Sequence, residues 1–379
     1  MAGWEALRDV YAAPDAAARA WKAGGGRVAG YLANTAPREL MAAAGFFPLQ
    51  LSGVAGEPTP LADRYMEDLF DPMVRSVFQR LLAGHYDFLD VLVLPRTSDS
   101  VQRLYYYLSE MDRVGAARLP EVRLLDLLHT PWSSSAAYNL ARMGELRAAL
   151  ERLGGKPVAD AALSAEIKAA NSRRASLRRL AEARRTRPPS RGAEQALHAF
   201  SAYHHMAGAD FDAAIAAALQ APPEAFPGAP RDGPRLVLSG SPLDNPALHR
   251  LVESLGAVVV GDHHPCGELM IGTDVAEAGD PMAALTEHYH RGVASSRTFP
   301  SRPGELVDFA RAAGADGVVF YFLAEEEALT WEYPGQKRAL EAAGIATLAF
   351  TMQPYRLDAE PLSGPLTAFI DGLRSARHG

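Results

Sequence analysis

The sequence predicts an α/β fold built from two doubly wound parallel-sheet lobes that are joined by a helical connection. Three observations support this prediction. At 379 residues, the chain is longer than one hydrophobic core usually organises. Near-continuous apolar runs, typical of parallel strands covered on both faces, alternate with helical patterns in both halves of the chain. A long helical stretch between the halves ends in a segment rich in proline and glycine.

The first lobe is predicted to occupy residues 1–135, including an amphipathic opening helix. After Gly24-Gly25-Gly26 the chain changes to a strand-like run, and Pro37 then suits the first position of a helix that stops near Gly45. A further helix carries Val101, Leu104 and Leu108 on one face. Strands are predicted over residues 27–32, 48–51, 88–94 and 122–128.

The helical connection is predicted over residues 136–230, and the second lobe over 231–379. Asn245-Pro246 is a pair that caps and opens a helix within this lobe. Strands are predicted over residues 235–238, 257–260, 317–322 and 345–350. This order gives two Rossmann-like or flavodoxin-like lobes, and we expect a ligand cleft between them.

Composition restricts the classes of function. The net charge of −7 argues against a general nucleic-acid binder, although a few arginines can still hold an anionic ligand such as an acyl-CoA thioester. No apolar run is long enough to span a bilayer, and the first residues do not form a signal peptide, so we expect a cytoplasmic protein. The single cysteine, Cys266, excludes an intrachain disulfide and any metal site that needs several thiolates from this chain.

Ligands of open α/β sheets bind beyond the carboxyl ends of the strands. Four predicted strand ends carry polar residues, and we place the candidate site among them. These segments are Ala33-Asn34-Thr35, Arg96-Thr97-Ser98-Asp99, Asp262-His263-His264 and Ala324-Glu325-Glu326-Glu327.

Four sequence segments carry a resemblance that covers nearly the whole chain. They are Gly30 to Gly45, which contains Pro37-Arg38-Glu39-Leu40; Leu94 to Asp99; Leu238 to Pro242 with Gly256 to Asp262; and Trp331-Glu332-Tyr333-Pro334 with the strand 345–350. In their order and spacing they resemble the 2-hydroxyacyl-CoA dehydratase D-component and benzoyl-CoA reductase subunit family. The resemblance implies a subunit that pairs with a homologous subunit, and hence a dimer.

The resemblance also implies a cofactor that this chain is not equipped to hold. Relatives place one cysteine at each of three strand ends and bind a 4Fe-4S cluster, to which an ATP-dependent activator supplies one electron. The matching positions here are Ala33, Ser98 and, with looser spacing, Glu326. Alanine has no donor atom, and hydroxyl and carboxylate oxygens are hard ligands that suit iron–sulfide poorly. We therefore expect no cofactor to be bound by this chain alone.

Three functions remain open on this basis. The first is a cluster-free subunit that contributes acyl-CoA binding or structure beside a cysteine-bearing homologous subunit. The second is a repurposed non-reductive acyl-CoA enzyme, of the lyase or hydratase type, with Ser98, Asp99, His263, His264 and Glu326 as its candidate catalytic residues. The third is a non-catalytic acyl-CoA-binding protein. We rank them in this order.

Each candidate also has a plain structural explanation. Ser98 and Asp99 suit a helix cap, which we favour over a functional pair, and the acidic run around Glu326 suits a solvated helix start. Asp262 to Glu268 is the most metal-like stretch, but adjacent residues rarely ligate one ion, so we expect no metal site. Candidate contacts to substrate, where ordinary surface arginine is the alternative, are Thr35, Arg38, Arg96 and Arg103. Histidines expected to be satisfied surface or core residues are His204, His205, His288 and His290.

Overall fold

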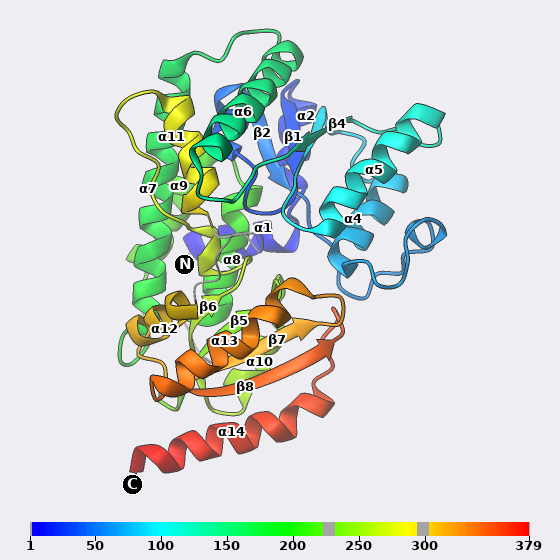
Figure 1. Ribbon diagram of the computed structural model, residues 1–379. Helices are drawn as coiled ribbons and strands as arrows, with labels where there is room; N and C mark the ends of the chain where they lie inside the picture. The colour runs from blue at the N-terminus through cyan, green and yellow to red at the C-terminus, as the bar shows by residue number, and fades with distance from the viewer. Residues whose placement is uncertain (1, 223–231, 294–302, 379) are drawn as a thin grey trace.

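The computed structural model describes residues 2–222, 232–293 and 303–378. Within these ranges the chain forms two four-stranded parallel sheets flanked by helices (Figure 1). The first sheet has the order β2-β1-β3-β4, with β1 Arg27–Tyr31, β2 Phe46–Gln50, β3 Val91–Pro95 and β4 Glu121–Leu125. The second has the order β6-β5-β7-β8, with β5 Arg235–Gly240, β6 Val258–His263, β7 Gly317–Leu323 and β8 Ala346–Gln353. The predicted fold class of two Rossmann-like or flavodoxin-like lobes is confirmed.

Helices cover both faces of each sheet. The first part of the chain contains α1 Ala2–Ala12, α2 Ala16–Ala23, α3 Arg38–Ala43, α4 Pro72–Leu82 and α5 Asp99–Val114. The helical connection contains α6 Ser133–Gly154, α7 Asp160–Arg185, α8 Ala193–His205 and α9 Gly208–Gln220. The last part contains α10 Ala247–Ser254, α11 Pro281–Glu287, α12 Pro303–Ala312, α13 Ala328–Ala342 and α14 Glu360–His378. Single turns lie at Ala62–Arg64 and Glu268–Met270, and a π-helical turn at His288–Gly292.

The inner strands β1, β3, β5 and β7 are buried at nearly every position, which explains their apolar sequences, whereas the edge strands β4 and β8 are partly exposed. Successive residues of a strand point to opposite faces, so Val91 and Val93 of β3 enter one core while Leu92 and Leu94 enter the other. In the second sheet, Val319 packs in the core that contains α14, and Val318 packs in the core that contains α12. Parallel strands covered in this way need an apolar residue at nearly every position.

Each sheet reverses its strand order at one point, and this point is where open α/β sheets bind ligands. The chain leaves β1 for β2 on one side and returns to β3 on the other, so the first reversal lies between β1 and β3. The second lies between β5 and β7. There Gly240 has φ +112°, and a β-carbon on it would lie 2.4 Å from the carbonyl oxygen of Tyr321. Only glycine allows this close approach.

Several helices pack outside the part of the chain to which their sequence position assigns them. Helix α1 lies in the predicted first lobe by sequence, but it packs on α8 and α9 of the helical connection. Helix α7 contacts both α3 in the first lobe and β6 in the second, and Figure 1 shows it running along one side of the molecule. Helix α11 packs on α6 and α7, away from the second sheet. In the described ranges, no helix combines the length and the apolarity that crossing a membrane requires.

Candidate functional site

The loops that follow the strands of the two sheets meet each other. The Nδ2 of Asn34, after β1, donates a hydrogen bond of 2.7 Å to the carbonyl oxygen of Pro265, after β6. Gly53, after β2, lies beside Tyr355, after β8, so closely that a β-carbon on Gly53 would be 3.0 Å from the tyrosine hydroxyl. The carboxyl edges of the two sheets therefore face one another, which is where the candidate site was predicted.

A cluster of acidic groups and one thiol lies at this junction. We use the name acidic cluster for Asp71, Asp244 and Cys266, because the charges of the two carboxylates act on the Cys266 thiol. Tyr355 donates its hydroxyl hydrogen to the carboxylate of Asp244, and Asp71 caps α4 by accepting from the backbone N–H of Met73 at 2.9 Å. Burial raises the pKa of both aspartates. Burial, with the two carboxylates, also raises the pKa of the Cys266 thiol well above its usual range, so the thiol stays protonated and is a poor nucleophile or metal ligand.

The sequence prediction missed this cluster, because its members come from separate loops. One local signal was present, since Asp71-Pro72 is a strong pattern for the start of a helix. Asp244 directly precedes Asn245-Pro246, which was recognised only as a helix start. No local pattern distinguishes Tyr355. The arrangement offers two carboxyl groups whose raised pKa values suit proton transfer.

Ser98 and Asp99 form the start of α5. The Oγ of Ser98 accepts a hydrogen bond of 3.2 Å from the backbone N–H of Val101, and Asp99 is the exposed first residue of the helix. The favoured explanation, a helix cap, is confirmed. The same helix start contacts the acidic cluster, because the Oγ of Ser100 accepts from the backbone N–H of Asp71 at 3.3 Å.

Glu326 lies near the start of α13. Its Oε1 accepts a hydrogen bond of 3.0 Å from the backbone N–H of Leu329, and burial together with the charge of Asp71 raises its pKa. The expectation of a fully solvated helix start is wrong in part: Glu327 is exposed, but Glu325 and Glu326 are half-buried. The reason is that this loop faces the other lobe. Among the described residues, Glu325 Oε2 is buried without a hydrogen-bond partner.

Ala33 directly follows β1 and adopts a left-handed backbone conformation, with φ +58°. This conformation costs a non-glycine residue about 1 kcal/mol. Ala33, Ser98 and Glu326 thus follow β1, β3 and β7, which are three of the four strands that border the two reversal points. None of the three supplies sulfur, and the polar atoms of Ser98 and Glu326 already accept hydrogen bonds within their own helices. This donor set does not fit an iron–sulfur cluster.

The four candidate substrate contacts have different surroundings. Arg96 forms an ion pair with Asp126 at 3.1 Å. Arg103 is exposed and lies 3.7 Å from Glu67, so it remains available at the surface. Thr35 and Arg38 are buried, so the alternative of an ordinary surface arginine is wrong for Arg38, and its contact with a substrate stays a prediction. Arg38 begins α3, whose packing against α7 carries it inside the protein.

His263 and His264 do not enter the junction between the lobes as catalytic groups would. His264 is fully buried and joins His249 and Asp262, whose Oδ1 lies 2.8 Å from Nε2 of His249. His263 packs against the ring of Phe309 at 5.0 Å between centroids, and burial lowers its pKa to about 4. Both rings are therefore neutral at pH 7, and we assign them to the core of the second lobe.

The predicted metal-like stretch takes part in a buried ion-pair network. His249, Asp262 and His264 offer ligand atoms within 4.8 Å of one another. However, Arg184 lies 2.7 Å from the other carboxylate oxygen of Asp262 and 3.5 Å from Glu268. Arg184 thereby holds the pKa of Asp262 well below its usual range, although burial acts in the opposite direction. The charge of Asp262 is already compensated by Arg184, so this network does not require a metal ion.

The other four predicted histidines lie in the core, but Nδ1 of His288 and of His290 is buried without a hydrogen-bond partner among the described residues, so the expectation that they are satisfied holds only in part. His204 pairs with the hydroxyl of Tyr31 at 2.7 Å, and His205 lies 3.0 Å from the carbonyl oxygen of Gln50. His290 lies 2.8 Å from the carbonyl oxygen of Thr130, and His288 lies 3.3 Å from Nη2 of Arg174. All four are buried.

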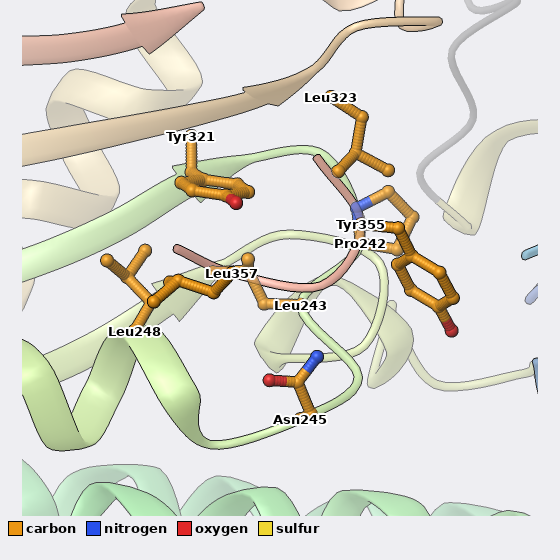
Figure 2. Close-up of a pocket in the computed structure, with 8 residues that line it drawn as sticks. All are labelled: Pro242, Leu243, Asn245, Leu248, Tyr321, Leu323, Tyr355 and Leu357. Atoms are coloured by element: carbon orange, nitrogen blue, oxygen red, sulfur yellow. The ribbon is translucent and has the colours of Figure 1, made fainter. Parts of the chain in front are cut away.

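Two small pockets adjoin the carboxyl edges of the sheets. The pocket of the second lobe lies beyond β5, β7 and β8 and is mostly apolar. Figure 2 shows the side chains of Leu243, Leu248 and Leu357 gathered on one side of the Tyr321 ring. The pocket of the first lobe lies beyond β1 and is lined by polar and charged groups, including Arg38 and Arg174.

Comparisons with known proteins identify the family. A model of the 2-hydroxyglutaryl-CoA dehydratase D-component matches residues 34–373. The chain is 23% identical to the beta subunit of the lactoyl-CoA dehydratase of Anaerotignum propionicum over 97% of each chain. It is 26% identical to one of the subunits of the benzoyl-CoA reductase of Thauera aromatica over 80% of each. It is 21% identical to the beta subunit of the (R)-2-hydroxyglutaryl-CoA dehydratase of Acidaminococcus fermentans over 97% of this chain and 98% of that protein. The chain therefore belongs to the 2-hydroxyglutaryl-CoA dehydratase D-component family.

Proposed function

We propose that this chain is the cluster-free subunit of a complex of the 2-hydroxyacyl-CoA dehydratase or benzoyl-CoA reductase type. It would contribute acyl-CoA binding or structure beside a homologous subunit that carries the iron–sulfur cluster. The relatives that it matches along their length are named as subunits of such enzymes. A partner subunit is therefore expected here as well.

One observation carries the cluster-free part of the proposal. The positions that match the family's cysteines are occupied by a left-handed alanine and by two side chains, Ser98 and Glu326, whose polar atoms accept helix N–H groups. The one cysteine, Cys266, follows β6, and burial raises the pKa of its thiol so that it stays protonated. A single protonated thiol among carboxylates does not replace three thiolates.

The test is co-expression with cysteine-bearing homologues encoded near this gene and with their ATP-dependent activator. We expect this chain to co-purify with such a homologue in a fixed ratio, and acyl-CoA turnover to require both chains. Ala33→Ser serves as a matched variant, because it changes a mapped position without adding a thiol and should leave assembly intact. Failure to associate with any homologous subunit would contradict the proposal.

The acidic cluster supports a second candidate, a non-reductive acyl-CoA enzyme. Asp71, Asp244 and Glu326 have pKa values raised by burial where the two sheets face each other, and such groups suit general acid–base catalysis. In that case the chain alone would convert an acyl-CoA thioester without ATP or a low-potential electron donor. Asp244→Asn would abolish this turnover. Acyl-CoA binding without turnover by any combination of subunits would instead indicate a binding protein.

A further inference from the structure

The pocket of the first lobe contains a buried cation, Arg38. Arg38 is only 8% exposed, and its guanidinium carbon lies 3.8 Å from the centroid of the Tyr203 ring. Stacking on the ring holds the guanidinium plane but does not neutralise its charge. In the described part of the chain, Arg38 forms no ion pair, and its Nη1 is buried without a hydrogen-bond partner. Arg38 also lines the pocket.

The neighbouring carboxylate is already engaged. One oxygen of Glu39 pairs with Nη2 of Arg174, and the other accepts a hydrogen bond of 2.6 Å from the hydroxyl of Tyr289. Nη1 of Arg174 donates to Oδ1 of Asn171 at 3.0 Å. The charge of Glu39 also acts on Arg38, but both of its oxygens are engaged elsewhere. Two arginines therefore share one carboxylate, and one positive charge is left over.

The other titratable groups around the pocket do not change this balance. Burial lowers the pKa of His204 well below its usual value and that of His288 to about 4, so both rings are neutral at pH 7. Burial raises the pKa of Tyr31 and Tyr289, so both hydroxyls keep their protons. Arg38 and Arg174 line the pocket and Glu39 pairs with Arg174 behind it, so these described groups together carry one net positive charge. A buried charge without a partner is strongly unfavourable.

We propose that this pocket binds a small monocarboxylate whose charge pairs with Arg38. One negative charge matches the single excess positive charge, whereas a phosphate group carries about −1.5 to −2 at pH 7. A guanidinium presents paired N–H donors that fit the two oxygens of a carboxylate. Met270 and Val293 add apolar wall to the same pocket, which suits a short hydrocarbon chain next to the carboxylate.

The test is titration calorimetry on the full chain with acetate, propionate and butyrate at constant ionic strength, with propionamide as the neutral control. We expect saturable binding of at least one acid in a one-to-one ratio, and none of propionamide. Removing the charged contact in Arg38→Met should weaken binding by about tenfold or more. Arg113→Met, at an exposed arginine on α5, should bind like the unchanged protein.

Three results would overturn the inference: no binding of any acid, equal binding of propionamide, or unchanged affinity in Arg38→Met. If Arg38→Met does not fold, Arg38→Lys replaces it, because lysine keeps the charge but not the paired donors. That variant should bind several-fold more weakly, and unchanged affinity would contradict pairing through the guanidinium. The inference does not depend on the proposed function, which is tested by subunit association and iron content.

Discussion

Asn34 and Pro265 connect the two lobes. The side-chain amide of Asn34, which follows β1, donates to the carbonyl oxygen of Pro265, which follows β6, at 2.7 Å. The two residues are 231 positions apart in sequence. Their contact lies one residue from Ala33 and one residue from Cys266, so it holds the loop with the first mapped family position against the acidic cluster.

Asn34→Ala should weaken the contact between the lobes. Loss of one partly buried hydrogen bond is expected to lower the free energy of unfolding by about 1 kcal/mol. Urea unfolding followed by tryptophan fluorescence measures this change. Gln220→Ala, at an exposed amide at the end of α9, is the control and should change stability less. A variant of Asn34 as stable as the unchanged protein would show that the lobes are held together by other contacts.

Ser98→Ala should destabilise α5 by about 1 kcal/mol, because the hydroxyl caps the helix. Thermal unfolding measures the loss. Ser98→Cys on its own should take up no iron, since the other two mapped positions still lack sulfur. Iron binding by this single variant would contradict the assignment of the cluster positions.

Glu39 should contribute to stability in a pH-dependent way. Burial alone would raise its pKa, but Arg174 and the hydroxyl of Tyr289 hold the pKa at about 2. Because the unfolded value is higher, about 4.3, the contribution of about 3 kcal/mol is fully present above pH 4.3 and is lost as the pH falls toward 2. Glu39→Gln should remove this dependence and destabilise the protein at pH 7 by about 3 kcal/mol or more.

Urea unfolding at pH 7 and pH 3 separates the two effects of Glu39→Gln. Glu110→Gln is the matched control, because its ion pair with Arg113 is exposed and should add little to stability. Equal losses of unfolding free energy in the two variants would show that the buried pair of Glu39 and Arg174 stabilises the protein no more than an exposed pair does.

Protonation of His263 should lower the free energy of unfolding in mild acid. Its folded pKa of about 4 lies below the unfolded value of about 6.5, so protonation favours the unfolded chain. The stability is present above pH 6.5 and declines as the pH falls toward 4. Between pH 7 and pH 5 the decline attributable to this group is about 2 kcal/mol. His263→Leu should show a correspondingly smaller loss over this interval, and an unchanged loss would place the titration at other groups.

The strands were predictable because burial of a strand requires apolar residues within the strand itself. A strand such as β3 is buried at every position, and this requirement appears in the sequence as an unbroken apolar run. Helix α4 was missed, although Asp71-Pro72 marks its start and its apolar residues Val74, Val77, Phe78 and Leu81 recur at helical spacing. The cap at Ser98 was predicted, since capping depends on residues only three positions apart.

The site itself was only partly predictable. The junction of the strand ends follows from the fold class, but the cluster of Asp71, Asp244 and Cys266 depends on how the two lobes meet. Similarly, Arg38 looks like a surface arginine in the sequence. Only the packing of α3 against α7 shows that it is buried beside Tyr203. Contacts between segments that are distant in the sequence determine the surroundings of the cluster and of Arg38, and no local sequence pattern predicts such contacts.

The iron and acid-labile sulfide content of this chain shows whether Ala33, Ser98 and Glu326 leave it without the donors for a cluster. It is measured on the chain expressed alone, purified anaerobically and incubated with iron and sulfide. We predict a colourless protein with no stoichiometric iron or sulfide, while a cysteine-bearing homologous subunit treated in the same way becomes coloured. Stoichiometric iron and sulfide on the isolated chain would mean that it holds a cluster with other donors.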